Sequence, residues 1–309
     1  MNKKNEPHRH HYIPQFIIKN FGIDKMGFVT VNYYDIKRKK FLTMPTEDIF
    51  SFYDLYRDEI NNADDSAKIE KDFAKYESEI ARIFKEKILD AKERITLTTK
   101  EHDSILLFLC LMEMRSKYVP EIFTKQPKDI LDNLKRIYKI EGDLIDFWRK
   151  NLGIIVNCRC LNDVLDNQEI NDFFKNIVYR NTYGPYGRYL IFAERRGNED
   201  FILSDTYPAL LEVFNDDGDQ LPLMSFCPIS PSRIIISACK GVETCPQQTR
   251  IFDKSFFSRP FVSSNKEKID FCIKKMYEKD VLAINTYMFE SSTEGIAVYD
   301  VDRFSAYKK

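Results

Sequence analysis

The most regular hydrophobic pattern in the chain lies between residues 66 and 92. Its apolar positions recur at the three- and four-residue spacing of one helix face, which predicts a helix. Ser66 is a candidate N-cap. Glu70 and Glu77 are seven residues apart, so they share a helix face that lies beside the apolar stripe. The apolar positions are Ile69, Phe73, Tyr76, Ile80, Ile83 and Ile88.

The next segment is apolar on nearly every side. Thr98 or Thr99, followed by Glu101, indicates a helix start with a capping box, and Pro120 indicates its end. A helix that is apolar all round is buried, so we expect this one at the centre of the fold. Arg115 comes at the end of the apolar run. A charge in that position needs a partner or an exit to the surface.

Shorter patterns complete the element order. Further helices are predicted over about 127–151, 163–179 and 266–291. A strand hairpin is predicted over 27–44, where Val29, Val31 and Tyr33 alternate with polar residues. The remaining strand-like runs are "RYLIFAE", "DFILSD", "PALLEVF", "MSFCPIS", "RIIISACK" and "GIAVYD".

This order of elements favours an α+β fold over an α/β fold, because strands and helices are segregated along the chain. We predict a central helical bundle (about 66–180) packed with a mainly antiparallel sheet that N-terminal and C-terminal strands form. We expect a single domain over 1–309, with a soft internal border near 181–188 between the helical part and the β-rich part.

Composition narrows the function classes. The chain has 309 residues and is 43% hydrophobic, so it can bury a sizeable core. It carries 47 basic against 48 acidic residues, so its net charge does not indicate a nucleic-acid-binding protein. Seven scattered cysteines and a polar N-terminus without an apolar signal predict a reducing, cytoplasmic location. The longest apolar run, "ILLFLCLM", is far shorter than the roughly 20 residues that span a membrane. We expect no membrane partner.

Three of the four histidines lie within the opening stretch "HRHHYIPQFIIKNF". His8 falls among terminal residues, which are usually poorly ordered. His10 and His11 directly precede an apolar segment, and adjacent residues of a strand point to opposite faces. One of the two rings could therefore face a pocket as a base or a metal ligand. Gln15 follows in the same stretch, and in isolation it is typical of a surface residue.

Further candidates lie in the C-terminal half. Asp205 ends the run "DFILSD", with Ser204 beside it, and a carboxylate at the end of a strand is typical of a ligand or general base but also of a turn or cap. Asn285 is an amide in the apolar run "VLAINTYMF", so it needs hydrogen-bond partners if buried. The chain contains no GxSxG, Walker A, GxGxxG or HExxH motif.

The opening motif "HHYIPQFIIKNF" resembles that of the family catalogued as domain of unknown function 4238. Further segments resemble it in the same order, and the likeness covers most of the chain. The sequence departs from the family pattern at Thr206-Tyr207, where a residue is added, and at Met112-Glu113. The resemblance implies a bacterial, intracellular, single-domain protein. It marks His10, His11, Gln15, Glu77, Arg115, Ser204, Asp205 and Asn285.

The first hypothesis is an enzyme that cleaves phosphodiester bonds, a nuclease or nucleotide hydrolase, in a defence or toxin-like system. His10 or His11 would act as base or ligand, Asp205 and Glu77 as ligands or orienting groups, and Arg115 as the anion contact. The substrate would be bound by Gln15, Ser204 and Asn285. The partner would be nucleic acid or nucleotide. The cofactor is unknown, and a divalent metal ion could take part.

Two alternatives remain open. The same residues could form a buried structural network in a non-catalytic binding or scaffold module. An open pocket lined by them would favour the enzyme, and full burial with mutual hydrogen bonds would favour the scaffold. The third hypothesis is NAD or nucleotide-sugar chemistry, such as glycohydrolysis. For the enzyme, the sequence predicts that His11→Ala and Asp205→Ala abolish function while the melting temperature stays nearly intact.

Overall fold

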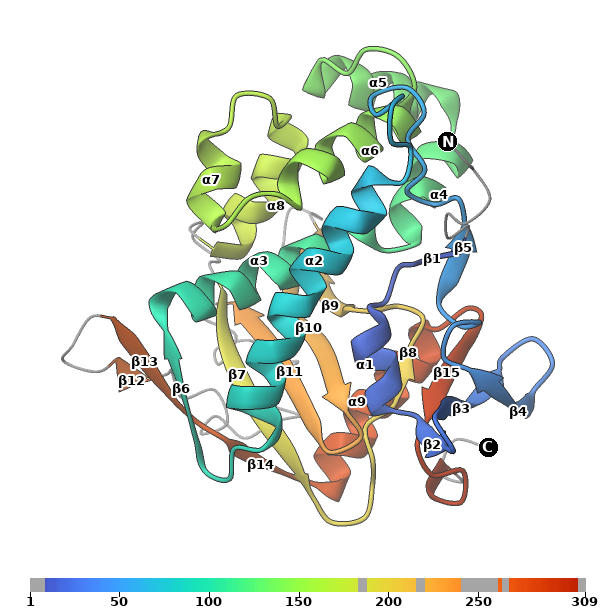
Figure 1. The fold of residues 1–309 in the computed structure, drawn as a ribbon, viewed down its shortest axis with the longest axis vertical. Helices are drawn as coiled ribbons and strands as arrows, with labels where there is room; N and C mark the ends of the chain where they lie inside the picture. The colour runs from blue at the N-terminus through green and yellow to red at the C-terminus, as the bar shows by residue number, and fades with distance from the viewer. Residues whose placement is uncertain (1–8, 183–187, 215–219, 240–260, 263–266, 305–309) are drawn as a thin grey trace.

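The computed structural model describes residues 9–182, 188–214, 220–239, 261–262 and 267–304. His8 and most of the predicted border at 181–188 lie outside these residues. Figure 1 shows the helices of residues 118–182 gathered at one end of the molecule, whereas the helices of residues 15–20 and 278–291 lie among strands toward the other end. The helices are α1 (Gln15–Asn20), α2 (Lys68–Ile83), the π-helical turn η2 (Phe84–Leu89), α3 (Thr99–Arg115), α4 (Tyr118–Lys125), α5 (Lys128–Tyr138), α6 (Leu144–Ile155), α7 (Leu161–Asp166), α8 (Asp172–Thr182) and α9 (Glu278–Ser291).

One of the two five-stranded sheets among the described residues has the strand order β14-β7-β11-β10-β9, in which β14 runs parallel to β7 and the other pairs are antiparallel. Its strand β7 is buried on both faces, because Leu190 and Phe192 pack toward the helices while Ile191 and Ala193 pack toward α9. This sheet is therefore an inner layer. Its strands are β7 (Arg188–Arg196), β9 (Ala209–Phe214), β10 (Gln220–Ser230), β11 (Arg233–Cys239) and β14 (Lys274–Tyr277).

The remaining strands form three antiparallel sheets. In one, the C-terminal β15 (Gly295–Val298) pairs with the N-terminal β3 (Phe28–Asp35) and with β8 (Leu203–Ser204). The α+β fold with mainly antiparallel pairing is thereby confirmed, although the strands form several sheets. The others are β1 (Arg9–His11), β2 (Ile23–Lys25), β4 (Lys40–Pro45), β5 (Ser51–Tyr53), β6 (Arg94–Thr98), β12 (Phe261–Val262) and β13 (Lys268–Cys272).

Helix α3 is the central element that its sequence predicts. Most of its residues are buried, and the Trp148 indole N–H of α6 donates to the backbone oxygen of Met114 at 2.8 Å. Its end differs from the prediction. The helix stops at Arg115 because Ser116 is extended, and Pro120 lies in the first turn of α4, where its missing N–H has no intrahelical partner to lose.

Four other helix predictions need correction. The predicted helix over about 163–179 is two helices, α7 and α8, with residues 167–171 between them. The predicted helix over 127–151 is two helices, because Lys139 adopts a left-handed conformation with φ of 52° and closes α5. The segment before α9 forms β13 and β14, and its alternating buried residues Phe271 and Ile273 have the period of a strand. Ser66 does not cap α2, whose N-cap residue is Ala67.

The capping box at the start of α3 is confirmed. The Glu101 N–H donates to the Thr98 hydroxyl oxygen at 3.2 Å, and the Thr98 N–H donates to the Glu101 carboxylate at 2.8 Å. We expect Thr98→Ala to lower the free energy of unfolding by about 1 kcal/mol, measured by urea denaturation. Thr98→Ser keeps the hydroxyl and serves as the control. Equal losses in both variants would contradict the capping role.

Candidate functional site

Arg115 is the buried cation around which the site is built. Its guanidinium donates to the Glu77 carboxylate of α2, to the backbone oxygen of His11 and, through Nε at 3.1 Å, to the Tyr56 hydroxyl. It also lies over the Phe73 ring, 4.1 Å from the ring centre. A charge at the buried end of α3 needs a partner, and Arg115 has three. Arg115 thereby fixes β1 against α2.

Two glutamates of α2 reach this region from one face of the helix, two turns apart. Glu77 forms the ion pair with Arg115, whereas Glu70 has a carboxylate oxygen, Oε2, that is buried and has no hydrogen-bond partner among the described residues. Burial raises the pKa of Glu70 to about 7, and the Glu77 charge adds to this rise while Arg115 opposes it. Near neutral pH, Glu70 therefore holds a proton more readily than an exposed glutamate does.

The two adjacent histidines of β1 have different surroundings, as alternation along a strand requires. His10 is buried, stacks on the Tyr56 ring at 5.7 Å, and accepts the Tyr56 backbone N–H at Nδ1 over 2.8 Å. His11 faces the side where Gln15 of α1 lies, with 3.4 Å between its Nε2 and the amide nitrogen. Burial, and then the Arg115 charge, lower the pKa of His11 to about 4. His11 is thus neutral at physiological pH.

His11, Gln15, Glu77 and Arg115 line one pocket of about 580 Å³. This volume is within the range of about 300–1,000 Å³ that small-molecule sites occupy. The sequence marks these four residues as candidates, and the fold brings them together from β1, α1, α2 and α3. The full lining is Arg9, His11, Gln15, Glu47, Asp48, Glu70, Ala74, Glu77 and Arg115.

Asp205 does not line this pocket. It is 1% exposed and belongs to a second cluster, in which the Lys117 ammonium donates to its Oδ2 and the Glu294 backbone N–H donates to the same oxygen at 2.8 Å. The Thr293 backbone N–H and hydroxyl also donate to Asp205. Arg115 and Lys117 are two residues apart, yet each serves a different cluster. The structure therefore does not place Asp205 in the lining of the pocket that His11 lines.

Ser204 and Asn285 are also held in internal contacts. The Ser204 hydroxyl is hydrogen-bonded to the hydroxyl groups of Ser292 at 2.5 Å and Thr206 at 2.6 Å. Asn285 of α9 donates to the backbone oxygen of Asp200 at 2.8 Å and accepts the backbone N–H of Ile202 at 3.2 Å. These bonds satisfy the buried polar groups, as burial requires. They tie α9 to the segment before β8.

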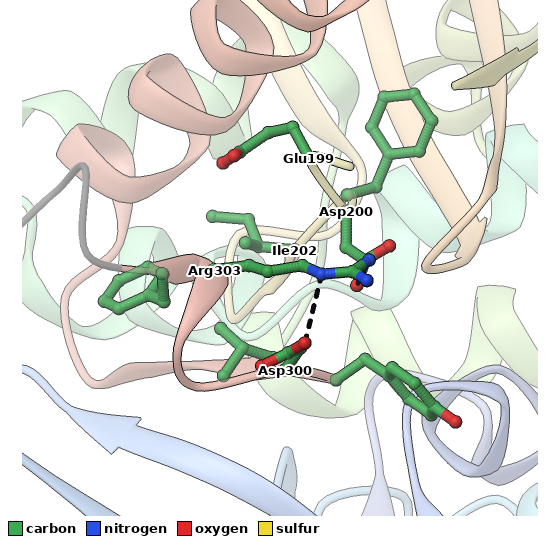
Figure 2. A pocket seen from close by; sticks show the side chains of 9 residues that line it. Glu199, Asp200, Ile202, Asp300 and Arg303 are labelled. Carbon is green, nitrogen blue, oxygen red and sulfur yellow. Dashed lines mark hydrogen bonds and ion pairs between the residues drawn. The ribbon is translucent and has the colours of Figure 1, made fainter. Parts of the chain in front are cut away.

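A second cavity lies beside Asp200, but it holds only about 10 Å³. Figure 2 shows Arg303 crossing this space between Asp200 and Asp300. Its Nε lies 3.0 Å from the Asp300 carboxylate, and its Nη1 lies 3.4 Å from that of Asp200. The space suffices for about one water molecule, so a substrate cannot enter it.

Several residues of the pocket are not candidates in the sequence. Arg9 and Asp48 form an ion pair of 2.6 Å across 39 residues, a contact that no local pattern indicates. Glu70 does have a signal, since it shares a helix face with Glu77. Outside the pocket, Lys117 of the Asp205 cluster has a weaker signal, because it follows the same buried run as Arg115. A charge so close to a buried helix end needs its own partner.

Two properties of the described residues bear on function. No three or more of their histidine, cysteine, aspartate and glutamate side chains are grouped so as to hold a metal ion. None of the helices in the described ranges is both long and apolar enough to cross a membrane.

The fold and the pocket define an α+β protein with a carboxylate-rich pocket between its opening strand and its first long helix. The family described as protein of unknown function DUF4238 matches residues 9–300. The chain therefore belongs to the DUF4238 family, as the opening motif indicated. No curated protein and no solved structure matches the chain.

Proposed function

We propose that this protein is a hydrolase and that the pocket at Glu70 and Glu77 is its active site. The observation that carries the proposal is the contrast between these two carboxyl groups. Glu70 is desolvated, with a pKa raised to about 7, whereas Glu77 pairs with the Arg115 guanidinium. Two carboxyl groups in such different environments are typical of a general acid beside a carboxylate base.

In this proposal each side chain of the pocket has one role. Glu70 donates its proton to the leaving group, and Glu77 accepts a proton from the attacking water. Arg115 holds Glu77 in place and fixes β1 through the backbone oxygen of His11. His11 and Gln15 bind the substrate through hydrogen bonds, because a neutral imidazole both donates and accepts.

The test is hydrolysis of a mixture of nucleosides, disaccharides and dinucleoside monophosphates, with products identified by mass spectrometry. We expect wild-type turnover to fall above about pH 7, as Glu70 loses its proton. Glu70→Gln and Glu77→Gln should each lose about 10²–10⁴-fold in rate. Glu79→Gln changes an exposed residue of the same helix outside this pocket and should retain the wild-type rate.

An absence of hydrolysis in all three compound classes would contradict the proposal. Turnover that survives Glu70→Gln at the wild-type rate would also contradict it, because another group would then supply the proton.

The phosphodiester substrate expected from the sequence is a second candidate, together with nucleic acid or nucleotide as the partner. The presence of Arg9 and Arg115 in the pocket lining favours it, since guanidinium groups bind phosphate. Dinucleoside monophosphates in the mixture test it directly. A bacterial cytoplasmic setting and a role in defence belong to this same hypothesis.

A non-catalytic binding or scaffold module is the other candidate. The internal hydrogen bonds of His10, Ser204, Asp205 and Asn285 favour it, because these marked residues connect elements of the fold. This hypothesis predicts that neither the wild type nor Glu70→Gln hydrolyses any compound of the mixture.

A further inference from the structure

The charge of the pocket argues against a phosphate-bearing ligand. Its lining carries four carboxyl groups, from Glu47, Asp48, Glu70 and Glu77, against the two guanidinium groups of Arg9 and Arg115. With Glu70 protonated, three carboxylates still outnumber two cations. A phosphate would enter a site of its own sign and be repelled by it.

Both arginines already pair with carboxylates of the pocket. Arg115 donates from Nη1, Nη2 and Nε to three groups of the protein, and Arg9 is paired with Asp48 at 2.6 Å. A phosphate that bound either guanidinium would compete to displace its paired carboxylate. For Arg115, the displacement would leave Glu77 without its ion-pair partner beside the desolvated Glu70.

We propose that the substrate is an uncharged or cationic glycoside, cleaved at the bond between its anomeric carbon and the leaving group. This inference rests on the proposed hydrolase function and names its substrate class. Glycoside cleavage passes through a transition state with positive charge on the sugar ring, and it uses one protonated and one ionised carboxyl group. An acidic pocket stabilises that developing charge.

The step balances without any redox partner. The bond from the anomeric carbon to the leaving oxygen or nitrogen breaks, and that atom takes the proton of Glu70. The oxygen of water bonds to the anomeric carbon, and its proton passes to Glu77. The products are the free sugar and the protonated leaving group. Exchange with solvent then returns the proton to Glu70 and removes the one on Glu77.

The position of the two glutamates leaves room for this substrate. A separation of seven residues places their backbones about 10.5 Å apart along the axis of α2. The short Ala74 side chain lines the pocket between them. Inverting glycosidases hold their two carboxyl groups about 6.5–9.5 Å apart, with a water molecule between them, and the inference requires the Glu70 and Glu77 carboxyl groups to lie in that range.

The first test compares leaving groups. We expect wild-type protein to hydrolyse one or more members of a panel of methyl and para-nitrophenyl glycosides and nucleosides. Glu70→Gln should lose about 10²–10⁴-fold on methyl glycosides or nucleosides and much less on para-nitrophenyl glycosides, because nitrophenolate leaves without a proton. Bis(para-nitrophenyl) phosphate should not be cleaved.

The outcomes separate the two proposals. Cleavage of bis(para-nitrophenyl) phosphate or of dinucleoside monophosphates alone, lost in Glu70→Gln, would overturn the glycoside inference and leave the hydrolase standing. An equal loss in Glu70→Gln for both leaving groups would also overturn it. Failure to hydrolyse any glycoside or nucleoside of the panel would overturn it as well.

A binding measurement tests the charge argument without turnover. An iminosugar that is protonated at pH 7 mimics the charged ring, and we expect one of a panel of such compounds to raise the melting temperature of the wild type but not of Glu77→Gln. Inorganic pyrophosphate should give no rise. A rise with pyrophosphate that disappears in Arg9→Gln would show an anion site and overturn the inference.

Discussion

Replacing Glu70 by glutamine is expected to stabilise the protein at pH 8 and to change its stability much less at pH 4.5. Glutamine has nearly the same shape as protonated glutamate but never carries the charge that this desolvated position disfavours. A pKa shift from 4.5 to about 7 corresponds to at most about 3 kcal/mol. We expect about 2 kcal/mol, because solvent reaches part of the side chain.

The sign follows from the raised pKa. A carboxyl group with a higher pKa in the folded state binds its proton more tightly there than in the unfolded chain. Its contribution to stability is therefore complete below pH 4.5 and is lost as the pH rises to about 7. His11 has the opposite sign, because its lowered pKa makes stability fall as the pH drops from 6.5 to about 4. Only the difference between variant and wild type isolates Glu70.

Urea unfolding of wild type, Glu70→Gln and Glu79→Gln between pH 4.5 and 8 measures this difference. Glu79→Gln should follow the wild type at every pH. A Glu70→Gln advantage that stays constant over the whole range would show that Glu70 titrates normally, and the assignment of Glu70 as the general acid would then fail with it. A stabilised but inactive variant would instead fit an active site that is kept strained for function.

The sequence predicted best what depends on neighbours along the chain. The spacing of apolar residues located α2, and the shared face of Glu70 and Glu77 follows from the geometry of one helix. The capping box at Thr98 and Glu101 is equally local. The errors are local in origin too. The periodicity over 127–151 continued through the left-handed Lys139, where a backbone conformation rather than a hydrophobicity pattern ends the helix.

The candidate site was predicted only in part, because the separation of its residues into two clusters depends on contacts between distant segments. Arg115 meets the backbone of His11 across 104 residues, and Lys117 meets Asp205 across 88. The pairing of β15 with β8 and the position of β1 beside α2 decide which cation meets Glu77 and which meets Asp205. No spacing in the sequence carries that information.

Replacing Asp205 by alanine is expected to destabilise the protein strongly, by about 3–5 kcal/mol. The sequence led to the opposite expectation, a nearly intact melting temperature. The structure gives the physical reason for the change. Lys117 is 3% exposed and would lose the carboxylate that accepts from its ammonium group, with only Glu294, at 3.5 Å, left as an ion-pair partner. The backbone N–H of Glu294 would lose its acceptor as well.

Two further variants assign this loss to the buried charge. Asp205→Asn keeps an oxygen that can accept the Glu294 N–H, so we expect it to cost less than Asp205→Ala. Adding Lys117→Met to Asp205→Ala removes the unpaired ammonium group and should recover part of the stability, which gives a coupling free energy in a double-mutant cycle by urea unfolding. Simple additivity of the two substitutions would mean that Lys117 and Asp205 do not stabilise each other. Because Asp205→Ala is expected to destabilise the folded protein, loss of function in that variant alone cannot assign Asp205 to catalysis. Glu70→Gln, which is expected to stabilise the fold, separates function from folding.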